Sequence, residues 1–250
     1  YGGDSSMVAS KLASGITKVF SNSAAFAALK ADGSVVTWGD LASGGDSSAR
    51  ENQLGSGVIQ IFSNEGAFAA LKDDGSVVTW GQEGIGGESA WISKTWPNLK
   101  LTEVTQIFSS AGAFAALKAD GSVITWGNVD WKDAYQLMIG KLSSGITNIY
   151  SNFAAFAALK ADGSIVTWGA NNFGGDSSMV ASKIASGVTQ IFSSSAAFAA
   201  LKADGSVVTW GSAGYGGNSS EVADKLSFGV NQIISSDSAF AALKSDGSVV

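Results

Sequence analysis

One pattern of apolar and polar positions recurs along the whole chain. Its first copy, at residues 26–39, reads Phe-Ala-Ala-Leu-Lys-Ala-Asp-Gly-Ser-Val-Val-Thr-Trp-Gly. The Asp-Gly-Ser step returns at intervals of 42, 46, 42, 42 and 42 residues, beginning at Asp32, Asp74, Asp120, Asp162, Asp204 and Asp246. Self-similarity at a constant period of this length is the signature of a repeat architecture. Six repeats therefore account for the chain, with no linker left over.

Each repeat predicts three short strands. The first is Val-Thr-Gln-Ile-Phe at 188–192, with equivalents at 16–20, 58–62, 104–108, 146–150 and 230–234. The second is Phe-Ala-Ala-Leu-Lys, and the third is Ser-Val-Val-Thr-Trp. Between these two, Ala-Asp-Gly predicts a hairpin turn in which Gly supplies a positive φ. The paired Ala residues let neighbouring sheets approach closely, so we expect Phe and Trp of the next repeat to fill the gap.

The rest of each repeat lacks the alternation of a strand. In residues 2–15, Asp4 or Ser5 could cap a helix, Val8 and Leu12 lie four positions apart, and Gly15 could end the helix. We therefore predict one or two helical turns in this connection. The alternative is an extended outer segment.

Short strands at a period near 42 residues are typical of propeller blades. The fold class predicted is all-β. The architecture predicted is a six-bladed β-propeller, with three to four short antiparallel strands per blade and a short helical turn in each connection. A solenoid is the competing architecture, but it normally needs atypical polar caps, and none is visible. We expect one repeat domain over residues 1–250, with the sixth repeat incomplete at its C-terminal end.

Composition narrows the chemistry. The chain has 32 Gly, one Pro, no Cys and no His, and its formal charge is −6. Without His or Cys there are no imidazole or thiolate metal ligands, no disulfides and no His-dependent triads. The acidic balance, with Arg50 as the single Arg, is a poor match for nucleic acid or an anionic membrane. No apolar run is long enough to span a bilayer, so we expect no membrane insertion.

The string Ala-Leu-Lys-x-Asp-Gly-Ser-Val-x-x-Trp-Gly resembles the repeat of the regulator of chromosome condensation family. The preceding Ser-Gly-Val-Thr-Gln-Ile and the repeat length are still more similar to the bacterial β-lactamase-inhibitory propeller protein of the same superfamily. This resemblance covers all six repeats. It implies a β-propeller fold and a role in binding other proteins.

Residues present in every repeat are expected to serve the shared fold. Asp of Asp-Gly-Ser is interpreted as a turn residue bonded to its own backbone, and the repeated Trp as core. Gly-Gly-Asp-Ser-Ser, at Asp4, Asp46 and Asp176, could offer oxygens to Ca²⁺, but each repeat supplies too few, so helix capping is favoured. The glycosylation sequon at Asn218 occupies the same position and is interpreted as a coincidence of the repeat. We expect no cofactor and no metal.

Residues that break the pattern carry the functional prediction. The connection at 88–101 is four residues longer than its equivalents, and the next, 128–138, has lost Gly-Gly-Asp-Ser-Ser. Together they hold the three Trp outside the repeat motif and the single Pro. The candidate partner-binding residues on these two loops are Trp91, Trp96, Pro97, Trp131, Tyr135 and Met138. Aromatic residues on loops over a rigid scaffold are typical of interaction hot spots. The alternative is that the longer loop buries Trp91 and Trp96 as a local cap.

The leading hypothesis is a non-enzymatic binding or scaffold module that recognises another protein or a larger assembly through these rim loops. The alternative is a structural repeat segment of a large secreted or cell-surface protein. An enzyme is disfavoured; its best form would be a glycosidase using Asp130 and Asp133. Nucleotide exchange on a GTPase would rest on family analogy alone. A carbohydrate ligand has little support in the sequence, and the compartment is unknown, with secretion or the cell surface favoured.

Overall fold

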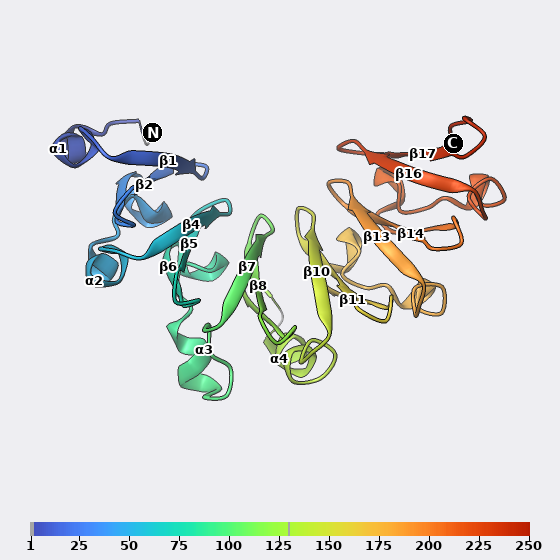
Figure 1. The fold of residues 1–250 in the computed structure, drawn as a ribbon, viewed down its shortest axis with the longest axis horizontal. Coiled ribbons are helices and arrows are strands. Elements are labelled where there is room, and N and C mark those ends of the chain that lie inside the picture. Colours follow the sequence, from blue (N-terminus) through green and yellow to red (C-terminus); the bar gives the residue numbers. More distant parts are fainter. Residues whose placement is uncertain (1–2, 130) are drawn as a thin grey trace. The chain divides into compact units, whose positions relative to one another are not determined.

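The computed structural model describes residues 3–129 and 131–250, with the backbone alone for Trp91 and for residues 131–134. The chain divides into two compact units, Tyr1–Val129 and Asp130–Val250, each holding three repeats. Figure 1 labels the elements along the chain. The expectation of one repeat domain over the whole chain stays a prediction.

The described residues form seventeen strands, grouped in antiparallel sheets of consecutive strands. Unit 1 contains β1 (Ile16–Ser21), β2 (Ala25–Lys30), β3 (Val35–Gly39), β4 (Val58–Ser63), β5 (Ala67–Lys72), β6 (Val77–Gly81), β7 (Val104–Ser109), β8 (Ala113–Lys118) and β9 (Val123–Gly127). Unit 2 contains β10 (Ile146–Ser151), β11 (Ala155–Lys160), β12 (Ile165–Gly169), β13 (Val188–Ser193), β14 (Ala197–Lys202), β15 (Val207–Gly211), β16 (Val230–Ser235) and β17 (Phe240–Lys244). The predicted strands are therefore confirmed in every repeat, and the sixth sheet has two strands.

The connections contain short helices, as predicted. The α-helices are α1 (Ala9–Leu12), α2 (Glu51–Leu54), α3 (Ala90–Thr95) and α4 (Trp131–Ile139). Single 3₁₀ turns are η1 (Ser6–Val8), η3 (Ser48–Arg50), η4 (Glu83–Ile85), η5 (Asn171–Phe173), η6 (Ser178–Val180), η7 (Ala213–Tyr215) and η8 (Ser220–Val222), and η2 (Leu41–Gly45) is a wider turn. In the first repeat, the Asp4 carboxylate accepts a bond of 2.9 Å from the backbone N–H of Ser6, which caps η1.

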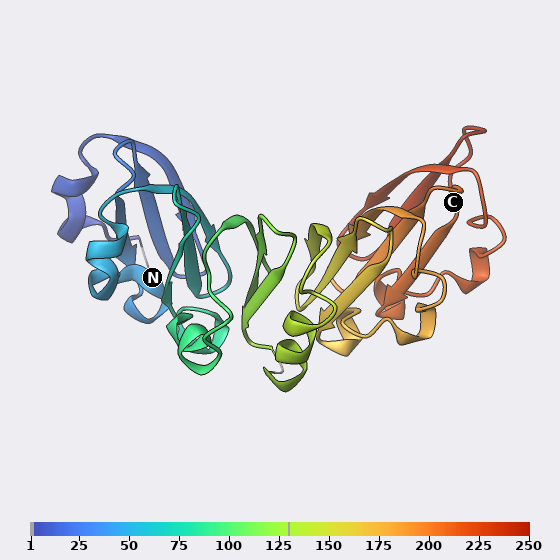
Figure 2. The same cartoon turned by 60° about the horizontal axis from the view of Figure 1, so that its bottom comes forward.

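The core lies between the sheets of successive repeats. In unit 1, Ala25 and Ala27 on one face of β2 pack against Phe68 and Trp80 of the next repeat. The Phe68 and Trp80 rings stack with their centroids 5.2 Å apart. Small residues on one sheet thus accept the large residues of the next, as the sequence predicted. Figure 2 shows the sheets of unit 1 side by side in this order.

A Gly pair completes the interfaces between successive repeats within each unit. Trp80 Nε1 donates to the carbonyl oxygen of Gly44 at 3.1 Å. Gly44 has φ of 95°, and a Cβ there would lie 2.8 Å from the Phe68 ring. The adjacent Gly45 would place a Cβ 2.4 Å from the carbonyl oxygen of Gly39. The repeated Gly-Gly is therefore required by close packing over the Phe–Trp pair.

Backbone hydrogen bonds also join successive repeats. At the tips of the first hairpins, the Ser23 N–H donates to Glu65 O, and the Glu65 N–H donates to Ala111 O, at 3.2 and 3.1 Å. At the other end of the strands, the Val58 N–H donates to Gly33 O at 3.0 Å. The same bonds recur within unit 2. Within each unit, successive repeats are thus joined at both ends of the strands, which gives a rigid frame for the connections between them.

Candidate functional site

The elongated connection of unit 1 folds as a helix and a return segment. α3 begins after Ser89, and the Glu88 carboxylate caps it by accepting from the Ala90 N–H at 2.7 Å. Ile92 is only 1% exposed and fastens the helix to the core. The return segment then pairs with the sheet, since the Val77 N–H donates to Leu101 O at 3.3 Å. This helix agrees with the short helical turn predicted for each connection, and the acidic residue before it and a run without Gly or Pro favour it.

The predicted residues on this connection differ in exposure. Pro97 is exposed, and Trp96 is half-buried. The backbone N–H of Trp96 donates to Ile92 O at 2.7 Å. The Trp91 side chain lies outside the described residues. The local-cap interpretation and the exposed-surface interpretation therefore both remain for this pair of Trp residues, while Pro97 lies at the surface in either case.

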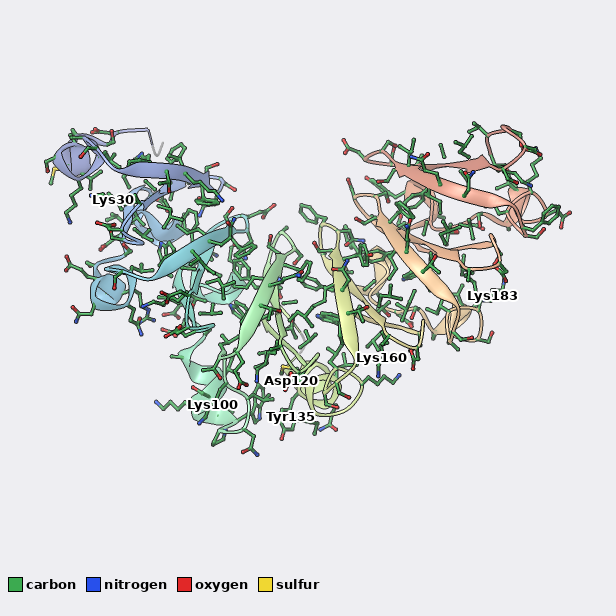
Figure 3. The ribbon with its side chains drawn as sticks, viewed as in Figure 1. Lys30, Lys100, Asp120, Tyr135, Lys160 and Lys183 are labelled. Atoms are coloured by element: carbon green, nitrogen blue, oxygen red, sulfur yellow. The ribbon has the colours of Figure 1, made fainter. Side chains whose placement is uncertain are left out.

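A pocket of about 330 Å³ lies beside α3. Its lining includes Arg50, Glu88, Ile92, Leu99 and Lys100. Figure 3 shows Lys100 on the segment that follows α3. The walls are thus mixed: aliphatic side chains from the longer connection lie beside two cationic groups and one carboxylate. Such a pocket suits an amphipathic side chain of a partner.

Sequence reasoning did not include Arg50 and Glu88 in the site. Arg50 Nη2 donates to Glu88 Oε2 at 2.5 Å, and the two side chains are 27% and 33% exposed. Both depart from the repeat. Arg50 stands where other repeats have Val8, Val180 and Val222, and Glu88 stands where Asp is common. That double departure was the signal in the sequence that could have found them.

The next connection, in unit 2, also forms a helix. α4 spans Trp131–Ile139, whose residues contain no Gly or Pro and place Tyr135, Met138 and Ile139 at helical spacing. Met138 is 2% exposed, so its side chain is buried. Tyr135 is half-buried and Ile139 is 50% exposed. Tyr135 is marked in Figure 3.

Three of the residues named from the sequence on this connection lie wholly or in part outside the described structure. The side chains of Trp131 and Asp133 are not described, and Asp130 lies outside the described residues. The two connections belong to different units, and each is described by itself. The site residues therefore stay a prediction as a set.

The repeated carboxylates have a structural role, as predicted. Asp32 Oδ1 accepts from Ser34 Oγ at 2.6 Å and from the Ser34 N–H at 3.0 Å. The side-chain bond from Ser34, followed by the backbone bond, lowers the pKa of Asp32 below its ordinary value. The same turn and the same direction of shift recur at Asp74, Asp120, Asp162, Asp204 and Asp246. These groups are ionised turn residues at neutral pH.

Four of the five repeated Trp side chains are core residues, and Trp38 is half-buried. Exposure is 3% for Trp80, 0% for Trp126, and 4% for both Trp168 and Trp210. No group of three or more acidic side chains in the described part of the chain could hold a metal ion. Over the same described residues, no helix is long and apolar enough to cross a membrane.

Comparison with solved structures identifies the fold. No protein-family model and no curated protein sequence matches this chain. Yeast RCC1 (Prp20), solved with Kap60 bound, is similar with a TM-score of 0.52 and 15% identity over 94% of this chain and 69% of that one. This likeness shows an RCC1-like β-propeller fold and confirms the resemblance drawn from the repeat motif. The number of blades in a closed ring stays a prediction.

Two further structures are similar at lower scores. Human WBSCR16 has a TM-score of 0.47 and 18% identity over 78% of this chain and 61% of that one. Prp20p from Saccharomyces cerevisiae, studied with its binding to Gsp1p and histones, has a TM-score of 0.48 and 17% identity, with coverages of 78% and 57%. The chain thus spans about three fifths of each of these proteins.

Proposed function

We propose that this chain is a non-enzymatic binding module whose propeller frame holds another protein through its two irregular connections. The observation that carries the proposal is the contrast between frame and connections. The strands, the turns and, within each unit, the Gly pairs are nearly the same in successive repeats, whereas residues 88–101 and 128–138 follow sequences of their own. A rigid scaffold that presents singular segments is a common way to build a binding surface.

The chemistry of the first connection supports a protein partner. Exposed Pro97, half-buried Trp96 and the pocket beside α3 combine apolar surface with Arg50 and Lys100. Aromatic and Arg side chains are enriched at the centres of protein interfaces. Yeast RCC1, which shares the fold, was crystallised with another protein, Kap60, bound to it.

Truncation of these side chains tests the proposal. Immobilised wild-type chain and the variants Trp96→Ala, Pro97→Ala and Tyr135→Ala are exposed to soluble protein from the native source. Captured polypeptides are quantified by mass spectrometry. At least one variant is expected to capture much less of a specific partner protein than the wild-type chain does, with little change in melting temperature. The control is Met179→Ala, at a side chain that is 96% exposed on a regular connection. Equal capture by all variants contradicts the proposal, and unfolding of Trp96→Ala supports the local cap.

A structural role is the second candidate. It is favoured by the bonds that join one repeat to the next in the same way within each unit, such as Val58 to Gly33 and Val188 to Gly163. A repeat held in this way suits a long segment of a surface protein. A native polypeptide far heavier than 25.3 kDa would favour this role, and one of that mass would count against it.

A further inference from the structure

Unit 2 has an aromatic pocket that neither irregular connection contributes to. Phe153 follows β10, Phe173 ends η5 and Tyr215 ends η7. The rings of Phe153 and Phe173 stack with centroids 5.8 Å apart and an angle of 28° between their planes. Together with Asn172, Ser195 and Ser212, the three aromatic residues line a pocket of about 450 Å³. Phe153 is 52% exposed and Tyr215 is 41% exposed, so both offer ring surface to solvent.

Hydrogen bonds hold the backbone of this pocket in place. Asn152 Nδ2 donates to Phe173 O at 2.7 Å, which fastens η5 to the tip of the fourth repeat. Ser194 Oγ donates to Tyr215 O at 2.8 Å, which fastens η7 to the fifth. The Phe153 N–H donates to Ser195 O at 3.2 Å and joins the two tips. The rings are therefore presented on a rigid frame, which lowers the entropy cost of binding.

The frame itself does not require aromatic residues. In unit 1 the same bonds run from Asn22 Nδ2 to Ser43 O at 2.6 Å and from Asn64 Nδ2 to Ile85 O at 2.5 Å. Ser43 and Ile85 there take the place of Phe173 and Tyr215. At the tip position of Phe153, the first repeat has Ser23. Since the turn forms with Ser or Ile, Phe153 and Tyr215 add a ring surface that the turn does not require, while Phe173 also packs against the core of unit 2.

The polar groups of the pocket define the class of ligand. Neither an acidic nor a basic side chain lines it in the described structure, so the pocket offers no charged partner and suits an uncharged ligand. Asn172, Ser195 and Ser212 make no side-chain hydrogen bond to another described residue. An amide and hydroxyls both donate and accept, as do the hydroxyls of a sugar. A sugar ring also has an apolar C–H face that can lie on an aromatic ring. We propose that this pocket binds a neutral saccharide, with one sugar ring against Phe153 or Tyr215.

A proline-rich peptide is the main competitor for aromatic pockets. Its backbone carbonyls only accept hydrogen bonds, so it would use the donors of this pocket and leave its acceptors unused. A saccharide uses both. The volume of about 450 Å³ falls within the usual range for small-molecule sites.

The test is a titration of the purified chain with four neutral trisaccharides, built from α-glucose, β-glucose, mannose and N-acetylglucosamine units, and with decaproline. Isothermal titration calorimetry gives affinity, and saturation-transfer NMR identifies the bound ring. At least one trisaccharide is expected to bind, and at least one of the variants Phe153→Ala and Tyr215→Ala is expected to weaken its binding at least tenfold. Phe153→Leu keeps apolar bulk without the aromatic face and serves if Phe153→Ala does not fold.

Ile85→Ala is the matched control, because it truncates the equivalent turn residue in unit 1 and is expected to leave affinity unchanged. The proposal is overturned if none of the four trisaccharides binds, or if a bound one keeps its full affinity in the Phe153 and Tyr215 variants. Binding of decaproline alone, at these rings, would also overturn it and assign the pocket to a peptide. The variants leave α3 and α4 intact, so this outcome is separate from that of the proposed protein-binding role.

Discussion

Arg50 joins the second repeat to the third through Glu88. Arg50 Nη2 donates to Glu88 Oε2, and Arg50 Nε donates to the carbonyl oxygen of Thr79 at 3.2 Å. Glu88 Oε1 meanwhile caps α3 at the Ala90 N–H. The Glu88 carboxylate thus accepts hydrogen bonds from both Arg50 and the Ala90 N–H, and the Glu side chain is one methylene longer than that of Asp. This ion pair therefore ties the start of the irregular helix to the preceding repeat and helps to shape the pocket beside it.

A double-mutant cycle measures that coupling. Arg50→Met and Glu88→Gln are each expected to lower the free energy of unfolding, and the coupling between them is expected to be about 1 kcal/mol. Both groups are partly exposed, so the coupling should shrink in 1 M NaCl. Urea denaturation of the four proteins provides the numbers. Additive effects at low salt would show that the pair does not stabilise the junction.

The Gly that faces the Phe–Trp pair is expected to be sensitive to substitution. Gly86 has φ of 110°, and a Cβ there would lie 2.7 Å from the Phe114 ring. We expect Gly86→Ala to destabilise the protein by about 2–4 kcal/mol. At Gly84, in the same turn, an added Cβ would have no other atom within 4 Å, so Gly84→Ala should change stability by less than about 1 kcal/mol. Similar melting temperatures for the two variants would contradict the packing argument.

Glu103 carries strain that the other repeats avoid. It has φ of 58°, at the position occupied by Gly15, Gly57 and Gly145 in other repeats. We expect Glu103→Gly to stabilise the protein by about 1 kcal/mol, because Gly adopts this conformation without steric cost. Glu103→Ala is the control: it also loses the ion pair with Lys118 but keeps the Cβ, and should give no gain. Chemical denaturation distinguishes them, and equal stability of the two variants would refute the strain.

The turn aspartates predict how stability depends on pH. Hydrogen bonds from Ser lower the pKa of Asp32, Asp74 and Asp120 in the folded state. A lowered folded pKa contributes stability above the unfolded value, near pH 4, and that contribution is lost as pH falls through the folded pKa. With no His in the chain, the melting temperature should be nearly constant from about pH 8 to 5 and fall below about pH 4.

Thermal melts by circular dichroism test this dependence, and 0.5 M NaCl is the control. Salt screens long-range charge effects but leaves the short hydrogen bonds of the turn in place. A melting temperature that stays constant or rises down to pH 3 would contradict the structural role of these carboxylates.

The repeat made most of the fold predictable. Phe68 and Trp80 could be assigned to the core because the same residues return in each repeat beside paired Ala, and only packing explains such a recurrence. The hairpin turns followed from Asp-Gly-Ser in the same way. The strand and turn preferences of the repeated residues agree with the packing of the sheets, so local sequence and tertiary structure favour the same fold.

The irregular segments were less predictable for a physical reason. A stretch such as residues 128–138 has no equivalent to compare with, so no repeated pattern indicated its helix or the burial of Met138. Phe153, Phe173 and Tyr215 were missed because they are distant in sequence and occupy different elements. Only the frame that fastens their turns brings the three rings into one pocket.

Site-specific photo-cross-linking tests the central claim, that the irregular connections hold a protein partner. Benzoylphenylalanine replaces Pro97 or Tyr135 in the chain, and Ala49 or Met179, exposed residues on regular connections, in the controls. After irradiation with soluble protein of the native source, adducts are identified by mass spectrometry. The account predicts one polypeptide cross-linked at position 97 or 135 and absent at 49 and 179. No adduct at either irregular connection, or the same adducts at all four positions, would contradict it.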